Sequence, residues 1–209
     1  DLLGRDSVRL DMGKIGEFIN GKSVMVTGAG GSIGSDLCRQ IARFHPSLLV
    51  MVDRTENNLY HIETEMRFRF KGLAIRAVLS DIQWKHKVRH IFKQCPCQVV
   101  FHAAAFKHVP MMEQFPWEAV SNNIRGTANL LAAAVATGVQ RFVLVSTDKA
   151  VRPTNVMGAT KRIAELLTLQ ATTESMRAMV VRFGNVVGSE GSVVPLFKKQ
   201  IERGGPVTV

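Results

Sequence analysis

Long hydrophobic runs are absent from the sequence, and so is any paired set of cysteines. No apolar stretch approaches the roughly 20 residues that a membrane-spanning helix needs, and the N-terminus does not read as a signal peptide. The three cysteines, Cys38, Cys95 and Cys97, are odd in number and show neither disulfide nor metal-ligand spacing. We therefore expect a soluble protein of the reducing cytoplasm, without a metal site.

Tyrosine is also scarce, and its scarcity bears on the chemistry. Tyr60 is the single tyrosine of the chain. Residues 146–161 read STDKAVRPTNVMGATK, a Ser-Thr pair at an expected strand end followed by a helix that carries Lys161. This pattern is typical of a nicotinamide-dependent dehydrogenase, in which a tyrosine precedes the lysine by one helical turn. Here that position is Met157, which cannot transfer a proton, so either the site is silent or other residues do the proton work.

The charge is one-sided. The chain has 209 residues, a formal net charge of +10 and 46% apolar residues, which fits one ordinary globular domain. An excess of this size is compatible with a polyanionic partner, an anionic membrane surface or a phosphorylated substrate, although a solvated basic surface is the simplest reading. No nucleic-acid-binding motif accompanies it, so we predict no nucleic-acid partner.

Apolar β-branched runs alternate with helical periodicity from residue 23 onward. This alternation predicts an α/β fold, a doubly wound parallel sheet of the Rossmann type with helices on both faces. The expected strands are Ser23–Val26, Leu48–Val52, Ala74–Leu79, Val99–His102, Phe142–Ser146 and Ala178–Phe183. The expected helices lie near 33–44, 57–70, 84–94, 118–137 and 156–174.

The two ends stand outside this alternation. Residues 1–21 belong to no strand–helix unit and are interpreted as a linker that precedes the catalytic domain. Residues 22–209 form the expected NAD-binding domain together with the start of a substrate-binding region. The final residues, ERGGPVTV, read as a helix end, a turn and the start of a strand, so we expect a fragment in which the C-terminal substrate region is truncated.

A glycine-rich turn joins the first strand to the first helix in VMVTGAGGSIGSDLCRQI. Gly28 permits the tight turn, Gly31 lets the backbone approach a pyrophosphate, and Gly34 lets the helix pack closely. The helix N-terminus would then present unpaired N–H groups and a partial positive charge to the phosphates. The loop is predicted to bind a dinucleotide through Thr27, Gly28, Gly30, Gly31, Ser32, Ile33 and Gly34.

Acidic residues after the second and third strands extend this cofactor site. Asp53 follows the loop by about 20 residues and is expected to hold the adenosine ribose hydroxyls and to repel a 2′-phosphate. Arg54, directly after it, could tolerate that phosphate, so NAD is expected in preference to NADP. Asp81, with Ile82, is a candidate for the adenine, but an ordinary helix cap would explain Asp81 almost as well.

Small residues follow the fourth strand in VVFHAAAFKHVPMMEQ. Ala103, Ala104 and Ala105 leave room for the nicotinamide ribose. Lys107 and His108 come next, in the crevice where open parallel sheets bind ligands. For His108 a structural role and a substrate-binding role are equally compatible with the sequence.

Four ordered motifs together resemble a known family: TGAGGSIG, HAAAFKHVPMMEQFPWEAVSNNIRGTANL, STDKAVRPTNVMGATKR and RFGNVVGSEGSVVPLFKKQI. They are similar to the extended short-chain dehydrogenase/reductases of bacterial polysaccharide biosynthesis. The resemblance is greatest to the large, membrane-associated, configuration-retaining UDP-N-acetylglucosamine 4,6-dehydratases. LLGRDSVRLD extends it toward the N-terminus, where the large members join a membrane-anchored region to the catalytic domain.

The resemblance accounts for the missing tyrosine, because methionine is usual there in these enzymes and a Thr-Asp-Lys triplet carries the proton chemistry. It implies that Thr147 hydrogen-bonds the sugar 4-oxygen and that Lys149 removes the proton from carbon 5. Asp148 would protonate the departing 6-hydroxyl, which requires a raised pKa. Lys161 would bind the nicotinamide ribose, and Met157 would form an apolar wall beside the sugar.

Substrate and partners follow from the same resemblance. It implies UDP-N-acetylglucosamine or a related UDP-sugar as substrate, and a homo-oligomer built on the helices near 118–137 and 156–174. The parent protein would be anchored at the cytoplasmic face of the inner membrane. Asn123 would orient the active-site helix through its backbone, Asn185 would contact the diphosphate, and residues 194–196 would wall the uracil. The predicted substrate-binding set is Lys107, His108, Asn123, Asn185, Val194, Pro195 and Leu196.

Two other interpretations stay open. One is a 4-epimerase or an inverting dehydratase of the same fold, and the other is a catalytically silent NAD-binding module. An epimerase returns the hydride to carbon 4 and needs no base at carbon 5, so incorporation of solvent deuterium separates it from a dehydratase. Arg182, in the last expected strand, is equally compatible with a structural ion pair.

Overall fold

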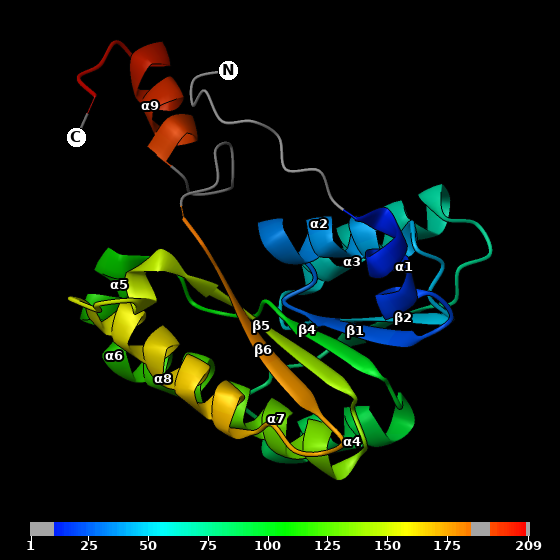
Figure 1. Cartoon of the computed structure of the whole chain (residues 1–209). Coiled ribbons are helices and arrows are strands. Elements are labelled where there is room, and N and C mark those ends of the chain that lie inside the picture. Colours follow the sequence, from blue (N-terminus) through cyan, green and yellow to red (C-terminus); the bar gives the residue numbers. More distant parts are fainter. Residues whose placement is uncertain (1–10, 185–192, 208–209) are drawn as a thin grey trace.

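A six-stranded parallel sheet forms the centre of the computed structural model, which describes residues 11–184 and 193–207 (Figure 1). The strand order is β3-β2-β1-β4-β5-β6, which confirms the predicted doubly wound fold. The strands are β1 Ser23–Thr27, β2 Leu48–Asp53, β3 Ile75–Leu79, β4 Val99–His102, β5 Arg141–Thr147 and β6 Arg177–Phe183. Each lies within one residue of its predicted bounds.

Helices cover both faces of the sheet. One face carries α1 (Met12–Ile19), α2 (Ser32–Ala42) and α3 (Glu56–Arg69). The opposite face carries α4 (Lys85–Gln94), α7 (Thr127–Ala136) and α8 (Val156–Gln170), as Figure 1 shows.

Alternating side chains of the central strands explain the two layers. In β1, Val24 and Val26 pack into the core under α1, α2 and α3, whereas Met25 packs into the core on the other face. In β2, Leu49 and Val50 divide in the same way. Because successive side chains of a strand point to opposite faces, an unbroken apolar run is what a sheet covered twice requires.

The predicted helix 118–137 is wrong in its details. It consists of α6 (Pro116–Ala119), a π-helical segment η1 (Val120–Gly126) and α7. A Cβ on Gly126 would lie 2.6 Å from Ile82 Cδ1, so the loop after β3 approaches this helix too closely for a side chain. π-Helical segments add a residue to the helical turn and often occur at functional sites.

Four further elements complete the described part of the chain, one of them the short 3₁₀ helix η2 (Asp148–Ala150) directly after β5. The sequence did not predict α5 (Val109–Gln114) as a helix, nor α1 within the predicted linker. Ile15, Phe18 and Ile19 of α1 pack on the core of their face, at the i, i+3, i+4 spacing of an amphipathic helix. The helix expected near the C-terminus is α9 (Val193–Glu202), and residues 203–207 form no strand. The linker and domain bounds stay predictions.

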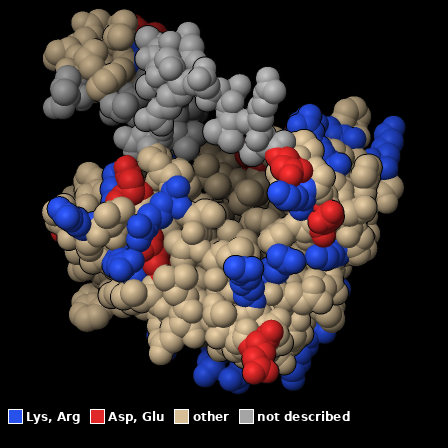
Figure 2. All heavy atoms as spheres, viewed as in Figure 1, with Lys and Arg blue, Asp and Glu red and all other residues tan. Residues whose placement is uncertain are grey.

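Basic side chains are spread over the visible face rather than gathered in one patch, with acidic ones among them (Figure 2). That distribution suits the reading of a solvated basic surface. Within residues 11–184 and 193–207, no helix is long and apolar enough to cross a membrane.

Candidate active site

The glycine loop after β1 is shaped by close backbone contacts. Gly28 has φ +71°, and a Cβ there would lie 2.6 Å from the backbone nitrogen of Ala104. A Cβ on Gly30 would lie 2.5 Å from Cβ of Asn58 in α3, and one on Gly34 would overlap the carbonyl oxygen of Gly28. The expected turn at Gly28 and close packing at Gly34 are therefore observed.

The glycine loop places the N-terminus of α2 at the carboxyl ends of the parallel strands. Gly31 is the N-cap and has no side chain, and a Cβ there would meet Gly28 O only at 3.4 Å. The first hydrogen bond to the N-cap carbonyl runs from Ser35 N to Gly31 O at 2.8 Å, so the N–H groups of residues 32–34 precede it. Unpaired N–H groups at the positive end of a helix suit a phosphate.

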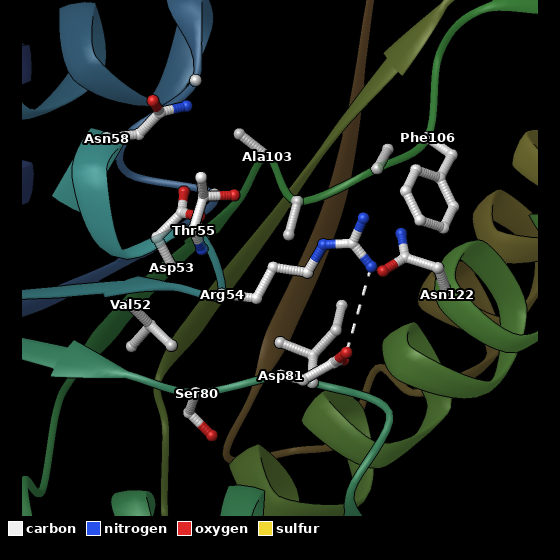
Figure 3. Close-up of a pocket in the computed structure, with 15 residues that line it drawn as sticks. Val52, Asp53, Arg54, Thr55, Asn58, Ser80, Asp81, Ala103, Phe106 and Asn122 are labelled. Carbon is white, nitrogen blue, oxygen red and sulfur yellow. Dashed lines mark hydrogen bonds and ion pairs between the residues drawn. The ribbon is translucent and has the colours of Figure 1, made fainter.

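A cavity of about 210 Å³ opens beside this loop (Figure 3). The ends of β1, β2, β3 and β4 surround it, which is where parallel sheets bind ligands. Nine of the predicted cofactor residues line it, whereas Thr27, Gly30, Ser32, Ile33, Gly34 and Lys161 do not. Six lining residues were not predicted: Val52, Thr55, Asn58, Ser80, Phe106 and Asn122. The lining comprises Gly28, Gly31, Val52, Asp53, Arg54, Thr55, Asn58, Ser80, Asp81, Ile82, Ala103, Ala104, Ala105, Phe106 and Asn122.

Asp53 ties the end of β2 to the glycine loop. One carboxylate oxygen accepts a hydrogen bond from Gly30 N at 2.9 Å and the other accepts one from Thr55 N at 2.8 Å. Each oxygen keeps a further lone pair that could accept a ribose hydroxyl. The carboxylate is thus fixed in direction before any ligand binds.

Asp81 closes the turn after β3 and is not the cap of α4. Its carboxylate accepts from Gln83 N at 2.8 Å, while the N-cap of α4 is Trp84. The helix-cap alternative for Asp81 is therefore wrong. Arg54 reaches across the cavity: its guanidinium carbon lies 4.2 Å from the centre of the Phe106 ring and its Nη1 lies 3.9 Å from Asp81 Oδ2.

A buried histidine, His102, connects the end of β1 to the start of α7. His102 Nδ1 lies 2.8 Å from Thr27 Oγ1, and its Nε2 lies 2.9 Å from Thr127 Oγ1. Since Thr127 donates its one hydroxyl proton to Asn123 O, Nε2 must donate to Thr127 and Nδ1 must accept from Thr27. Burial, with a smaller contribution from the charge of Lys161, lowers the pKa of His102 to about 3, so the ring is neutral.

Asn123 holds the loop after β4. Its Oδ1 accepts from Phe106 N at 2.9 Å, and its Nδ2 donates to Phe106 O at 3.1 Å and to Thr160 Oγ1 at 3.0 Å. The residue is 1% exposed. The contact to helix α8 is therefore made by the side chain of Asn123 and not by its backbone. A substrate-binding role of Asn123 stays a prediction.

The Thr-Asp-Lys triplet leaves β5 as a connected unit. Thr147 Oγ1 donates to Asp148 Oδ1 at 2.9 Å, and Lys149 Nζ lies 3.2 Å from the same oxygen. These two contacts, Thr147 first, lower the pKa of Asp148. The raised pKa that an acid role requires is therefore not found in the unliganded protein, because Asp148 is exposed and hydrogen-bonded as an anion.

Lys161 lies buried behind the triplet. Its Nζ donates to Val145 O at 2.8 Å, and burial lowers its pKa to about 8, against an opposing effect of Glu165. Met157, one turn earlier, is 4% exposed and packs with Met112 and Ala119. It therefore contributes to a small core as well as standing at the position of the missing tyrosine.

Glu165 is a site residue that the sequence analysis missed. Its carboxylate accepts from Ser146 Oγ at 2.6 Å, from Arg162 Nη1 at 3.0 Å and from Nε and Nη2 of Arg182 at 2.8 and 2.6 Å. Burial raises its pKa, but the hydrogen bonds from Arg182, Ser146 and Arg162 outweigh it and hold the pKa at about 2. The sequence feature that could have revealed Glu165 is its spacing: it lies four residues after Lys161, on the same face of the helix.

Gly158 was missed as well. A Cβ at this position would lie 2.5 Å from Lys149 O, so α8 lies directly against the triplet turn. The start of α8 is fixed by Asn155, whose Oδ1 accepts from Gly158 N at 2.8 Å, and by Glu113, whose Oε1 accepts from Val156 N at 2.7 Å. These contacts position Lys149 relative to the helix of Lys161.

The structure describes the side chains of only some of the other predicted substrate-binding residues. Lys107 and His108 are exposed, and His108 is the N-cap of α5. Asn185 lies outside the described residues. Val194, Pro195 and Leu196 fall within α9, and their side chains also lie outside the described part. Within residues 11–184 and 193–207, no group of three or more His, Cys, Asp or Glu side chains could hold a metal ion.

Fold and site together define a doubly wound α/β protein of the short-chain dehydrogenase/reductase class. A glycine loop ends β1, an aspartate ends β2, and a Ser-Thr pair at the end of β5 faces the helix of a buried lysine. The chain belongs to the family described as polysaccharide biosynthesis protein, which matches residues 24–209. This confirms the predicted family.

Curated relatives and a solved structure agree with this assignment. The chain is 53% identical to the probable polysaccharide biosynthesis protein EpsC of Bacillus subtilis over its whole length, which is 35% of that relative. It is 36% identical to a UDP-N-acetylglucosamine 4,6-dehydratase (inverting) of Campylobacter jejuni, covering 91% of this chain and 58% of the relative. Pen from Bacillus thuringiensis superposes with a TM-score of 0.85 at 37% identity, covering 92% of this chain and 61% of that one.

Proposed function

We propose that the protein is an NAD-dependent 4,6-dehydratase that converts UDP-N-acetylglucosamine to the 4-keto-6-deoxy sugar for a surface polysaccharide or glycan, with retention at carbon 5. The observation that carries the proposal is the joined triplet Thr147-Asp148-Lys149 beside Lys161, with Met157 in place of a tyrosine. A dehydration needs an acid and a base that a simple hydride transfer does not. The family, and the relative named as an inverting UDP-N-acetylglucosamine 4,6-dehydratase, support the class of substrate and the dehydration. Retention at carbon 5 rests on the resemblance of the sequence motifs alone.

The residues present fit a dinucleotide. The N–H groups of residues 32–34 would bind the diphosphate, and the two oriented oxygens of Asp53 would accept the ribose hydroxyls. A Cβ on Gly28 or Gly34 would disrupt this loop. When bound, the nicotinamide would accept the hydride from carbon 4 of the sugar and return it to carbon 6.

The chain's own residues supply the proton steps. The Thr147 hydroxyl would hydrogen-bond the 4-oxygen, and the 4-hydroxyl would give its proton to the Asp148 carboxylate as the ketone forms, which acidifies the proton on carbon 5. Lys149 would remove that proton, and Asp148, now protonated, would give its proton to the 6-hydroxyl, which departs as water. Lys149 would return a proton to carbon 5 as the hydride reaches carbon 6. Buried Lys161 would hold the nicotinamide ribose and stabilise the negative charge that develops at the 4-oxygen.

The acid role sets a condition on the substrate complex. In the unliganded protein Thr147 and Lys149 both lower the pKa of Asp148. The bound sugar would take over the Thr147 hydroxyl and exclude water, and both changes favour the neutral carboxyl. The Asp148–Lys149 pair would then hold one proton, on Asp148, which gives it to the departing hydroxyl while Lys149 takes the proton of carbon 5.

A homo-oligomer is part of the proposal. Ile163, Leu166 and Leu169 form an exposed apolar row along α8, between 42 and 52% exposed. A row of this kind on a helix that already packs against α7 suits a helical interface between two copies. The anchoring of the parent protein at the cytoplasmic face of the inner membrane stays a prediction.

The test follows the sugar directly. Full-length protein is mixed with UDP-N-acetylglucosamine in D₂O, and the sugar is followed by proton NMR. We expect a new methyl signal, a hydrated 4-ketone and deuterium at carbon 5, with the configuration at carbon 5 separating retention from inversion. Conversion to the 4-epimer without deuterium at carbon 5 would replace the dehydratase by an epimerase. An unchanged sugar with dinucleotide bound would favour another nucleotide sugar or a silent binding module.

A further inference from the structure

We propose that Phe106 and Asp81 make the cofactor site selective for NAD by holding Arg54 away from Asp53. The inference rests on the proposed cofactor site and deepens it. It concerns the single phosphate by which NADP differs from NAD, on the 2′-oxygen of the adenosine ribose. An aspartate at the end of β2 repels that phosphate, while an arginine nearby accommodates it. The chain has both residues in succession, so the sequence alone leaves the selectivity open.

Asp53 is fixed in the orientation that favours NAD. Backbone N–H groups on either side, from Gly30 and Thr55, hold its two oxygens at 2.9 and 2.8 Å. These bonds keep the carboxylate at the mouth of the glycine loop, where it would meet the ribose hydroxyls. A 2′-phosphate bound there would face a carboxylate that cannot turn away without breaking the loop contacts.

Arg54 points in the other direction. Figure 3 shows its side chain extending away from Asp53, across the cavity toward Phe106 and Asn122. The guanidinium stacks on the Phe106 ring at 4.2 Å from the centroid, and Nη1 lies 3.9 Å from Asp81 Oδ2. In this arrangement the positive charge nearest in sequence to Asp53 lies on the opposite wall of the cavity.

The ring that holds Arg54 is itself anchored. The backbone N–H and carbonyl of Phe106 are both bonded to the Asn123 side chain, and its ring packs against the small core of Met112 and Met157. Phe106 is therefore in place before any ligand enters. Arg54 is held less firmly, since its side chain is 42% exposed and a part-exposed cation–π contact is weak.

Because Arg54 is held less firmly than Phe106, the proposal can be tested by removing the contact that holds Arg54. Dissociation constants for NAD⁺ and NADP⁺ are measured by calorimetry on the wild type and on Phe106→Leu, which keeps an apolar side chain and removes the ring face. We expect the wild type to bind NAD⁺ more tightly, and Phe106→Leu to lower the ratio of the NADP⁺ to the NAD⁺ constant by about 3-fold, the worth of one cation–π contact. Phe106→Tyr keeps the ring face and should keep the wild-type ratio.

Arg54 provides the second half of a double-mutant cycle. Arg54→Ala alone should leave the ratio within about 2-fold of the wild type, because the guanidinium does not reach the 2′-position there. Combined with Phe106→Leu, it should abolish the change that Phe106→Leu produces. Asp81→Asn, which keeps the size of the side chain and removes its charge, should shift the ratio in the same direction as Phe106→Leu.

Each contrary result has its own meaning. If neither dinucleotide binds, the cofactor assignment fails and this inference fails with it. If NAD⁺ binds but the ratio is the same in Phe106→Leu and Asp81→Asn as in the wild type, the dehydratase proposal stands and the holding of Arg54 is refuted. Tighter NADP⁺ binding by the wild type, lost in Arg54→Ala, would also refute it and would show that Arg54 reaches the phosphate.

Discussion

Glu165 and Arg182 join helix α8 to strand β6 by a two-point ion pair, with Nε and Nη2 of the arginine 2.8 and 2.6 Å from the two carboxylate oxygens. The carboxylate is 1% exposed and also receives the hydroxyl of Ser146 from β5. Lys161 lies one helical turn earlier on α8. The pair therefore fixes the helix of the buried lysine against the two strands whose ends carry the site.

Glu165→Ala should lower the free energy of unfolding by about 2 kcal/mol, because it leaves the buried Ser146 hydroxyl and the part-exposed Arg182 guanidinium without their acceptor. Urea unfolding followed by circular dichroism measures the loss. Glu63→Ala is the matched control, since Glu63 pairs with Arg67 on the more exposed surface of α3 and should cost under about 1 kcal/mol. Equal losses in the two variants would show that Glu165 is only a surface contact.

The same carboxylate predicts a pH dependence. Its pKa is about 2 in the folded chain against an ordinary 4.5, so the folded state holds its proton less tightly than the unfolded state. The stability that Glu165 contributes is present above pH 4.5 and is lost as the pH falls toward 2. Urea midpoints between pH 7 and pH 3 should decline less steeply in Glu165→Gln than in the wild type. Glu65, with its pKa also near 2 beside Arg39 and Arg69, supplies the decline that remains.

Lys149→Met and Asp148→Asn should each lower the rate of dehydration by about 10²–10⁴-fold, the usual range for a general base or acid. NAD binding should be unchanged, because neither residue lines the dinucleotide cavity. Proton NMR of the sugar in D₂O measures both turnover and exchange at carbon 5. Exchange at carbon 5 should disappear in Lys149→Met. Exchange that persists in this variant would show that Lys149 is not the base.

Two variants control for charge and for the absent tyrosine. Arg152→Gln removes an exposed cation three residues after Lys149 and should leave the rate within a few-fold. Met157→Tyr should not raise the rate, because the triplet and not this position moves protons. Full activity of Lys149→Met, or a gain in Met157→Tyr, would contradict the assignment.

Gly158→Ala should destabilise the chain by about 1–3 kcal/mol, the usual cost of adding a methyl group to a packed position, since its Cβ would lie 2.5 Å from Lys149 O. The turnover should fall as well, because α8 and the triplet turn must separate. Gly16→Ala in α1 is the control: its Cβ would meet only Phe44 Cδ1 at 3.9 Å, so it should stabilise the helix by about 0.5–1 kcal/mol. Thermal unfolding of both variants and turnover of Gly158→Ala test this prediction. An unchanged stability and turnover in Gly158→Ala would contradict it.

The local sequence pattern was sufficient to predict the sheet and the conformation of the glycine loop. Gly28, Gly34 and Asp53 take their roles from residues close in sequence and from the ends of adjacent strands, so spacing reveals them. The strand bounds follow in the same way from apolar runs that both faces bury.

What the sequence could not reveal depends on contacts between distant segments. The close contact of Ile82 with Gly126 joins the loop after β3 to η1, and Glu165 receives its ion pair only because β6 brings Arg182 to it. The lowered pKa of Asp148 follows from the geometry of its two neighbours, which the family resemblance does not contain. Each of these is a property of packing and not of composition.

The chain of hydrogen bonds through His102 has a consequence for ligand affinity. It runs from Thr27, directly before the glycine loop, through Thr127 to Asn123, which bonds the residue before Lys161. The glycine loop and helix α8 are therefore fixed relative to each other by side-chain hydrogen bonds. Their conformational entropy is lost once, during folding, so the proposed dinucleotide would meet a preorganised site whose ordering does not weaken its binding.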